Sequence, residues 1–193
     1  MSVSASVNTR ASFLAVSLPA AMMLAGWMAW PAPARTSEAV ESDKVSAILS
    51  AAKMQAFQIK EDADRLESYT RSDISWESHA DAVNTMKENV NKMGKLLAEL
   101  QDNRKDAAPW QQTAIDRIIP VAKELAGNAS AAITALNKNP RRINTGPYQE
   151  YVESLCDAAN NLAATIADFT DYGKTKERMS RLERKLEIPG GGK

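Results

Sequence analysis

The residue in this 193-residue chain best suited to acid–base or metal chemistry is its only histidine, His79, because an imidazole titrates near neutral pH. It lies in WESHADAVNTMKENVNKMGKLLAEL, residues 76–100, where two series of residues recur at every seventh position. One series is Trp76, Val83, Val90 and Leu97, and the other is His79, Met86, Met93 and Leu100. Because the two series are three residues apart, they predict one apolar stripe along a helix, with His79 inside it.

A histidine in such a stripe has three possible roles. An axial ligand of a b-type haem would need a second ligand, but Met86 and Met93 are on the same helix, roughly 10 and 20 Å along it. A metal site needs three or four ligands, and only Cys156 could join His79. A buried imidazole, neutral at pH 7 and held by one hydrogen bond, needs neither. We expect this last role, with no cofactor and no metal, and the haem-binding, cytochrome-like bundle using His79 is the alternative. The neighbours expected in its layer are Ala63 or Leu66, Ala129 or Ile133, and Leu155 or Cys156.

The single cysteine, Cys156, leaves no possibility of an internal disulfide. It could form an intermolecular disulfide or act as a redox thiol, but that requires a nearby cation or helix N-terminus to lower its pKa. Its neighbour in sequence is the acidic Asp157. We therefore predict a half-buried, unreactive thiol. Since the chain offers no base besides His79 and no glycine-rich phosphate loop, we do not expect an enzyme.

The segment KTKERMSRLERKLEI, residues 174–188, combines a narrow apolar stripe with an excess of basic residues. Six basic and three acidic side chains leave it a net charge of +3. It could be a solvated helix stabilised by pairs four residues apart. It could instead dock on a protein partner, on a second copy of this chain, or on an anionic membrane surface. The residues expected to make such a contact are Met179, Leu182, Leu186, Arg178, Arg181, Arg184 and Lys185.

Four helices would position these residues. Apolar spacing and helix-capping residues predict helices over 42–70, 74–105 and 109–138, and a fourth that opens at Pro147. The fold class is therefore all-α, an antiparallel up-down-up-down four-helix bundle with an extended C-terminal helix. The fourth helix has about 40 residues against about 30 in the others, so it should extend roughly 15 Å beyond the bundle, at the pole where the first helix begins.

The N-terminal residues 1–34 have the pattern of a targeting segment. Arg10 precedes the uncharged residues 12–30, and Ala32 and Ala34 have the spacing of a cleavage site. We expect a signal peptide cleaved after Ala34, or else an uncleaved N-terminal anchor, because about 20 apolar residues span a bilayer. Residues 35–41 would then be a linker, 42–188 the bundle and 189–193 a disordered tail.

The balance of charge constrains the partner. Lys plus Arg and Asp plus Glu number 24 each, so the formal net charge is zero, which argues against nucleic acid as a ligand. The sequence thus predicts an exported, non-enzymatic binding module of the cell envelope, periplasmic or extracellular, and tethered to the inner membrane if the N-terminal segment stays uncleaved. Its expected partner is a protein or a second copy, bound through the C-terminal helix, with peripheral membrane contact as an alternative.

Overall fold

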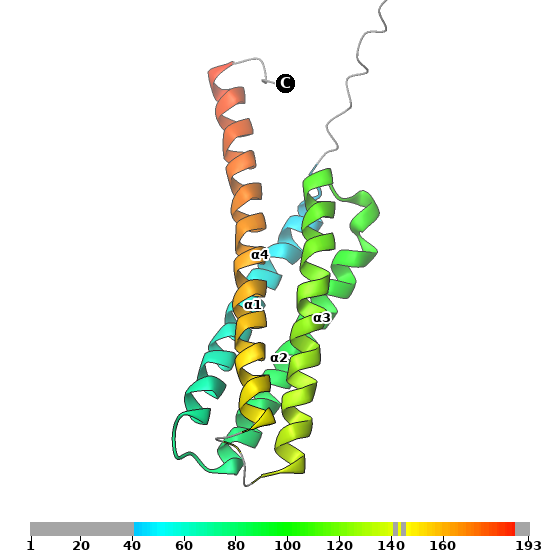
Figure 1. The fold of residues 1–193 in the computed structure, drawn as a ribbon. Helices are drawn as coiled ribbons and strands as arrows, with labels where there is room; N and C mark the ends of the chain where they lie inside the picture. Colours follow the sequence, from blue (N-terminus) through cyan, green and yellow to red (C-terminus); the bar gives the residue numbers. More distant parts are fainter. Residues whose placement is uncertain (1–40, 141–142, 144–145, 188–193) are drawn as a thin grey trace, which may run out of the picture. The chain divides into compact units, whose positions relative to one another are not determined.

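The computed structural model describes residues 41–140, 143 and 146–187, and this part of the chain is helical, without strands (Figure 1). The expected signal peptide or anchor (1–34), most of the linker (35–40) and the C-terminal end (188–193) lie outside the described residues. The elements are α1 (Asp43–Thr70), α2 (Trp76–Asp102), the short 3-10 helix η1 (Arg104–Asp106), α3 (Pro109–Lys138) and α4 (Pro147–Leu186).

Local sequence explains where the helices begin. The Ser42 and Ser75 hydroxyl oxygens accept hydrogen bonds from backbone N–H groups in the first turns of α1 and α2. Pro109 and Pro147 open α3 and α4, where the missing N–H of proline costs nothing. The predicted helix boundaries are confirmed within three residues. The largest difference is at the end of α2, which lies at Asp102 rather than 105 because the turn of η1 follows it.

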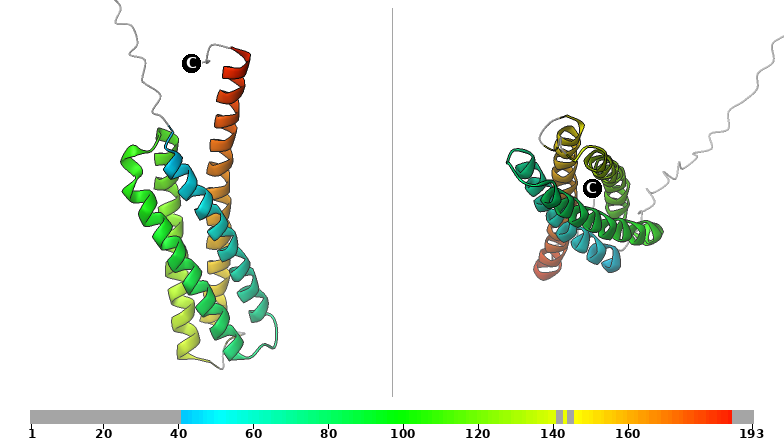
Figure 2. Two further views of the ribbon diagram at one scale, coloured as in Figure 1. Left: turned by 180° about the vertical axis from the view of Figure 1, so that it is seen from behind. Right: turned by 90° about the horizontal axis from the view of Figure 1, so that it is seen from below.

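The four helices form the predicted antiparallel up-down-up-down bundle (Figures 1 and 2). α1 packs against α2 and α4, and α3 packs against α4 and α2, so each helix has two neighbours of opposite direction. The α2–α3 interface is the least extensive of the four.

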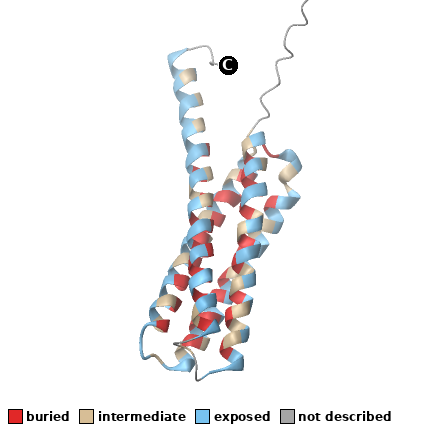
Figure 3. Cartoon of the chain, viewed as in Figure 1, coloured by how far each residue is buried: buried red, intermediate tan, exposed pale blue. Residues whose placement is uncertain are grey.

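The core lies along the inner faces of the helices (Figure 3). The apolar series that predict α1 and α3 from their spacing are fully or almost fully buried. They are Val45, Leu49, Ala52, Ala56, Ile59, Ala63 and Leu66 on α1, and Ile115, Ile118, Ala122, Leu125, Ala129, Ala132 and Leu136 on α3. The predicted stripe of α2 is wrong at three of its eight positions. His79, Val83, Met86, Met93 and Leu100 are buried, whereas Trp76 is 46% exposed and Val90 and Leu97 are only half-buried. The helix is rotated so that Asn89 faces inward, where its Nδ2 donates to the buried Asp62 Oδ2 of α1 over 2.6 Å.

α4 is longer than its neighbours, with 40 residues against 27 to 30 in the others. Its last buried residue is Gly173. The thirteen residues after it, 174–186, therefore project roughly 20 Å beyond the bundle, at the pole where α1 begins and α2 turns into α3 (Figure 1). The extended C-terminal helix predicted from sequence is thus present, and we call residues 174–186 the projecting segment.

Candidate functional site

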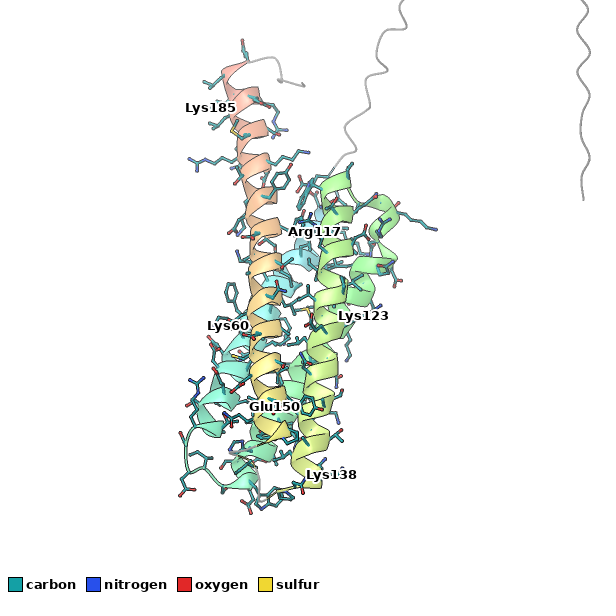
Figure 4. The ribbon with its side chains drawn as sticks, in the orientation of Figure 1. Lys60, Arg117, Lys123, Lys138, Glu150 and Lys185 are labelled. Carbon is teal, nitrogen blue, oxygen red and sulfur yellow. The ribbon has the colours of Figure 1, made fainter. Side chains whose placement is uncertain are left out.

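The residues predicted to make contacts all lie on the projecting segment, and all are exposed. Met179, Leu182 and Leu186 are 54%, 43% and 61% exposed. The basic residues of the same set share this exposure: Arg178, Arg181, Arg184 and Lys185. In Figure 4, Lys185 marks this end of the molecule, and Lys138 the opposite pole. The structure thus gathers the predicted residues on one length of helix, beyond the last buried residue of α4.

The apolar residues of the projecting segment face away from the bundle. An α-helix turns by roughly 100° per residue, so positions around the helix can be counted from the inward-facing Gly173. Met179, Leu182 and Leu186 then lie roughly 180° to 240° from the inward direction. The apolar stripe is therefore on the outer side of α4, where its own bundle cannot cover it.

Charged residues flank this stripe unequally. By the same count, Arg178 and Lys185 lie on one side of it and Glu183 lies on the other. Arg181 points further round and binds Glu177 through an ion pair of 2.6 Å, outside the stripe. One flank is thus basic and the other acidic.

Trp110 and Gly173 fix the point where α4 leaves the bundle. Trp110 is in the first turn of α3, and a Cβ atom at Gly173 would lie only 2.6 Å from its Cη2 atom. The indole therefore packs directly on the backbone of α4. It also meets the Tyr172 ring edge to face, with centroids 5.5 Å apart. Sequence reasoning missed this pair, and the glycine alone does not indicate it, because Gly94 and Gly127 also lie inside helices and a Cβ there would meet nothing within 4 Å.

Polar contacts reinforce the same pole. The fully buried Gln111 of α3 accepts a hydrogen bond from the Ser42 N–H over 3.1 Å, and its Nε2 donates to the Ser42 carbonyl over 3.0 Å. Lys53 of α1 forms an ion pair of 2.8 Å with Asp171, just before the projecting segment. The start of α1, the start of α3 and the exit of α4 are therefore bound together, so the projecting segment leaves from a rigid base.

His79 lies at the opposite pole, fully buried in the first turn of α2. Its Nδ1 shares a hydrogen bond of 3.0 Å with the Tyr148 hydroxyl, and its ring meets the rings of Tyr69 and Tyr148 edge to face. Its Nε2 has no hydrogen-bond partner among the described residues. Burial lowers the pKa of His79 below its ordinary value, and the nearby carbonyl of Tyr69 opposes this only in part.

The burial and the hydrogen bond expected for His79 are both observed. The two tyrosines beside it were missed, because Tyr69 ends α1 and Tyr148 begins α4, outside the apolar series used to predict its neighbours.

Cys156 is an almost fully buried thiol, only 6% exposed, and so more enclosed than predicted. Its Sγ donates to Asp64 Oδ1 over 3.3 Å and approaches Glu67 Oε2 at 3.7 Å. Burial, together with these carboxylates, raises the pKa of the thiol to about 12. The thiolate is therefore scarce at neutral pH, as expected for an unreactive cysteine.

A groove of about 590 Å³ opens between α2 and α3, lined by the half-buried Val90, Leu97 and Ile119. It follows the least extensive helix interface, which explains why Val90 and Leu97 of the predicted α2 stripe are only half-buried. Within the described ranges, no three His, Cys, Asp or Glu side chains gather closely enough to hold a metal ion. None of the described helices has the length and hydropathy needed to cross a bilayer.

Fold and site together define an antiparallel four-helix bundle with one helix extended beyond it. Comparison of the chain with protein-family models, curated proteins and solved structures found no match.

Proposed function

We propose that this chain is an exported, non-enzymatic protein of the cell envelope, and that it acts as an interaction module through the projecting segment. One observation carries the proposal. The helix continues for thirteen residues past its last buried contact, and it presents Met179, Leu182 and Leu186 outward on a rigid base. Amphipathic helices are stabilised mainly by burying their apolar face, so an uncovered face on a helix of this length favours a partner.

The composition of the projecting segment supports the same proposal. It is rich in Lys, Arg, Glu, Leu and Met, which are strong helix formers, so it can stay helical before its partner arrives. Export is supported by the pattern of residues 1–34 alone. A protein or membrane partner fits the neutral chain better than nucleic acid does.

The haem alternative has less support. His79 is fully buried, and the rings of Tyr69 and Tyr148 pack against its ring edge to face. A macrocycle bound to the imidazole would have to displace side chains that are packed around it. A haem absorption band that survives reconstitution and washing, and that His79→Ala removes, would favour this alternative after all.

A single acidic substitution tests the proposal. Leu182→Glu places a charge in the stripe, and Met54→Glu is the matched control at an exposed methionine on α1. Three associations are measured in the full chain: molecular mass by light scattering, binding to phosphatidylglycerol vesicles, and photo-crosslinking from position 182 in the cell. We expect at least one association, weakened tenfold or more by Leu182→Glu and unchanged by Met54→Glu. No association by any of the three, or equal effects of the two substitutions, would contradict the proposal.

A further inference from the structure

We propose that the partner of the projecting segment is a second copy of this chain, and that two such helices pair side by side, parallel and in register, as a short two-stranded coiled coil. This inference rests on the proposed function and identifies the partner at that same site.

The apolar residues have the spacing of a coiled coil. Tyr172, Met179 and Leu186 are seven residues apart, and Thr175 and Leu182 are seven apart and three residues further on. They correspond to the a and d positions of two heptads. One heptad earlier, the d position is the exposed Asp168, which would face the same carboxylate of the second copy. Pairing is therefore favoured over 172–186 and opposed before it.

The direction of the stripe makes the pairing sterically feasible. Met179, Leu182 and Leu186 lie on the side of α4 opposite the buried Gly173. The axes of two projecting segments can therefore approach to the 8–10 Å that separates packed helices. Each bundle then lies on the side of its own α4 that faces away from the second copy. The helices are already formed, so association does not have to supply the cost of nucleating them.

The charges beside the stripe select the parallel arrangement. Arg178 takes the g position and Glu183 the following e position, five residues later. In a parallel pair, these positions meet across the interface, so Arg178 binds Glu183 of the second copy, and symmetry makes this contact twice. Neither residue has an ion-pair partner within the described part of the chain. An antiparallel pair would instead place Arg178 near Lys185 of the second copy, and like charges repel.

A membrane surface fits the same charges less well. Helices that lie on anionic membranes carry basic residues on the polar face bordering their apolar side, where the side chains reach the headgroups. Here Glu183 occupies one border of the stripe, and Arg184 points to the side of the helix opposite it. Lying flat would thus bring an acidic residue to anionic headgroups and turn a basic one away.

Charge reversal tests the inference directly. Arg178→Glu and Glu183→Arg each create two repulsive contacts in a parallel pair, whereas an equimolar mixture of the two variants restores both contacts as attractive ones. Arg184→Glu changes the charge equally at a position away from the interface and is the control. Molecular mass is measured by sedimentation over a dilution series, with the same preparation of the full chain for every variant.

We expect the parent chain and Arg184→Glu to dimerise. Glu183→Arg should dimerise at least tenfold more weakly than the parent, and its equimolar mixture with Arg178→Glu should recover the dimer. A parent chain that is monomeric throughout, or a Glu183→Arg variant that dimerises as strongly as the parent, overturns the inference. If the parent is monomeric but Leu182→Glu abolishes vesicle binding or crosslinking to another protein, only the inference fails. If Leu182→Glu changes no association, the proposed function fails with it.

Discussion

Gly173→Ala should destabilise the protein relative to the same change at other helical glycines. Inside a helix, replacing Gly by Ala usually stabilises by about 0.5–1 kcal/mol, because glycine has more backbone freedom to lose on folding. At Gly173, however, the new Cβ would lie 2.6 Å from Trp110 Cη2, well inside van der Waals contact. Overpacking of this kind costs about 1–3 kcal/mol.

The chain provides matched controls for this substitution. A Cβ at Gly127 of α3 or Gly94 of α2 would meet nothing within 4 Å, so each control should show only the helix-forming gain. We therefore expect the free energy of unfolding of Gly173→Ala to lie about 1–3 kcal/mol below that of Gly127→Ala. Urea unfolding followed by far-UV circular dichroism measures the difference.

A second substitution shows whether Trp110 is the cause. Trp110→Leu shortens the side chain that meets Gly173, so the cost of Gly173→Ala should be smaller in the Trp110→Leu background. If Gly173→Ala stabilises the protein as much as Gly127→Ala does, the indole does not pack on the backbone of α4, and the rigid base of the projecting segment is wrong.

Three other predictions concern the core. Because burial lowers the pKa of His79 in the folded state, the unfolded chain binds more protons below neutral pH. The free energy of unfolding, measured by urea titration, should therefore fall by at most about 2 kcal/mol from pH 7 to pH 5. The His79→Leu variant should not show this fall. At pH 7, His79→Leu leaves the Tyr148 hydroxyl unpaired and should lower the free energy of unfolding by about 1–3 kcal/mol. Adding Tyr148→Phe should recover part of this loss. If the losses from the two substitutions simply add, the two side chains are not coupled. Leu162→Ala should lower the free energy of unfolding by about 2–5 kcal/mol, and Leu97→Ala should lower it clearly less, because only Leu162 is fully buried. Equal losses of stability in the two variants would contradict the observed rotation of α2.

The sequence predicts this fold well because periodicity and capping act within one helix. The series through Ile59 and Leu125 identified the inner faces of α1 and α3, and Pro147 marked the start of α4. Burial at the edge of a stripe depends on how closely the next helix packs, which the spacing within one helix does not reveal. Leu97 was therefore predicted to be buried, whereas the α2–α3 interface leaves it only half-buried.

The candidate site divides in the same way. The exposed residues of the projecting segment follow from helix length and spacing, which can be counted along the chain. The packing of Trp110 on Gly173, and the tyrosines beside His79, depend on which helix ends meet in space. Contacts between residues so far apart in sequence do not follow from the periodicity of any one helix.

Disulfide trapping at position 175 is the most direct test of the central claim, that projecting segments pair in parallel and in register. Thr175→Cys places one thiol at a d position, where identical residues of a parallel pair meet. In an antiparallel pair with Arg178 beside Lys185, the same two thiols would lie roughly 20 Å apart along the helices. Arg184→Cys places one thiol on the opposite side of the helix as the control. The native Cys156 should not react, because it is buried and its thiol pKa is raised to about 12. Under mild oxidation, we predict that Thr175→Cys forms a covalent dimer rapidly and Arg184→Cys does not. Equal rates of crosslinking for the two variants, or no crosslinking of Thr175→Cys, would contradict the claim.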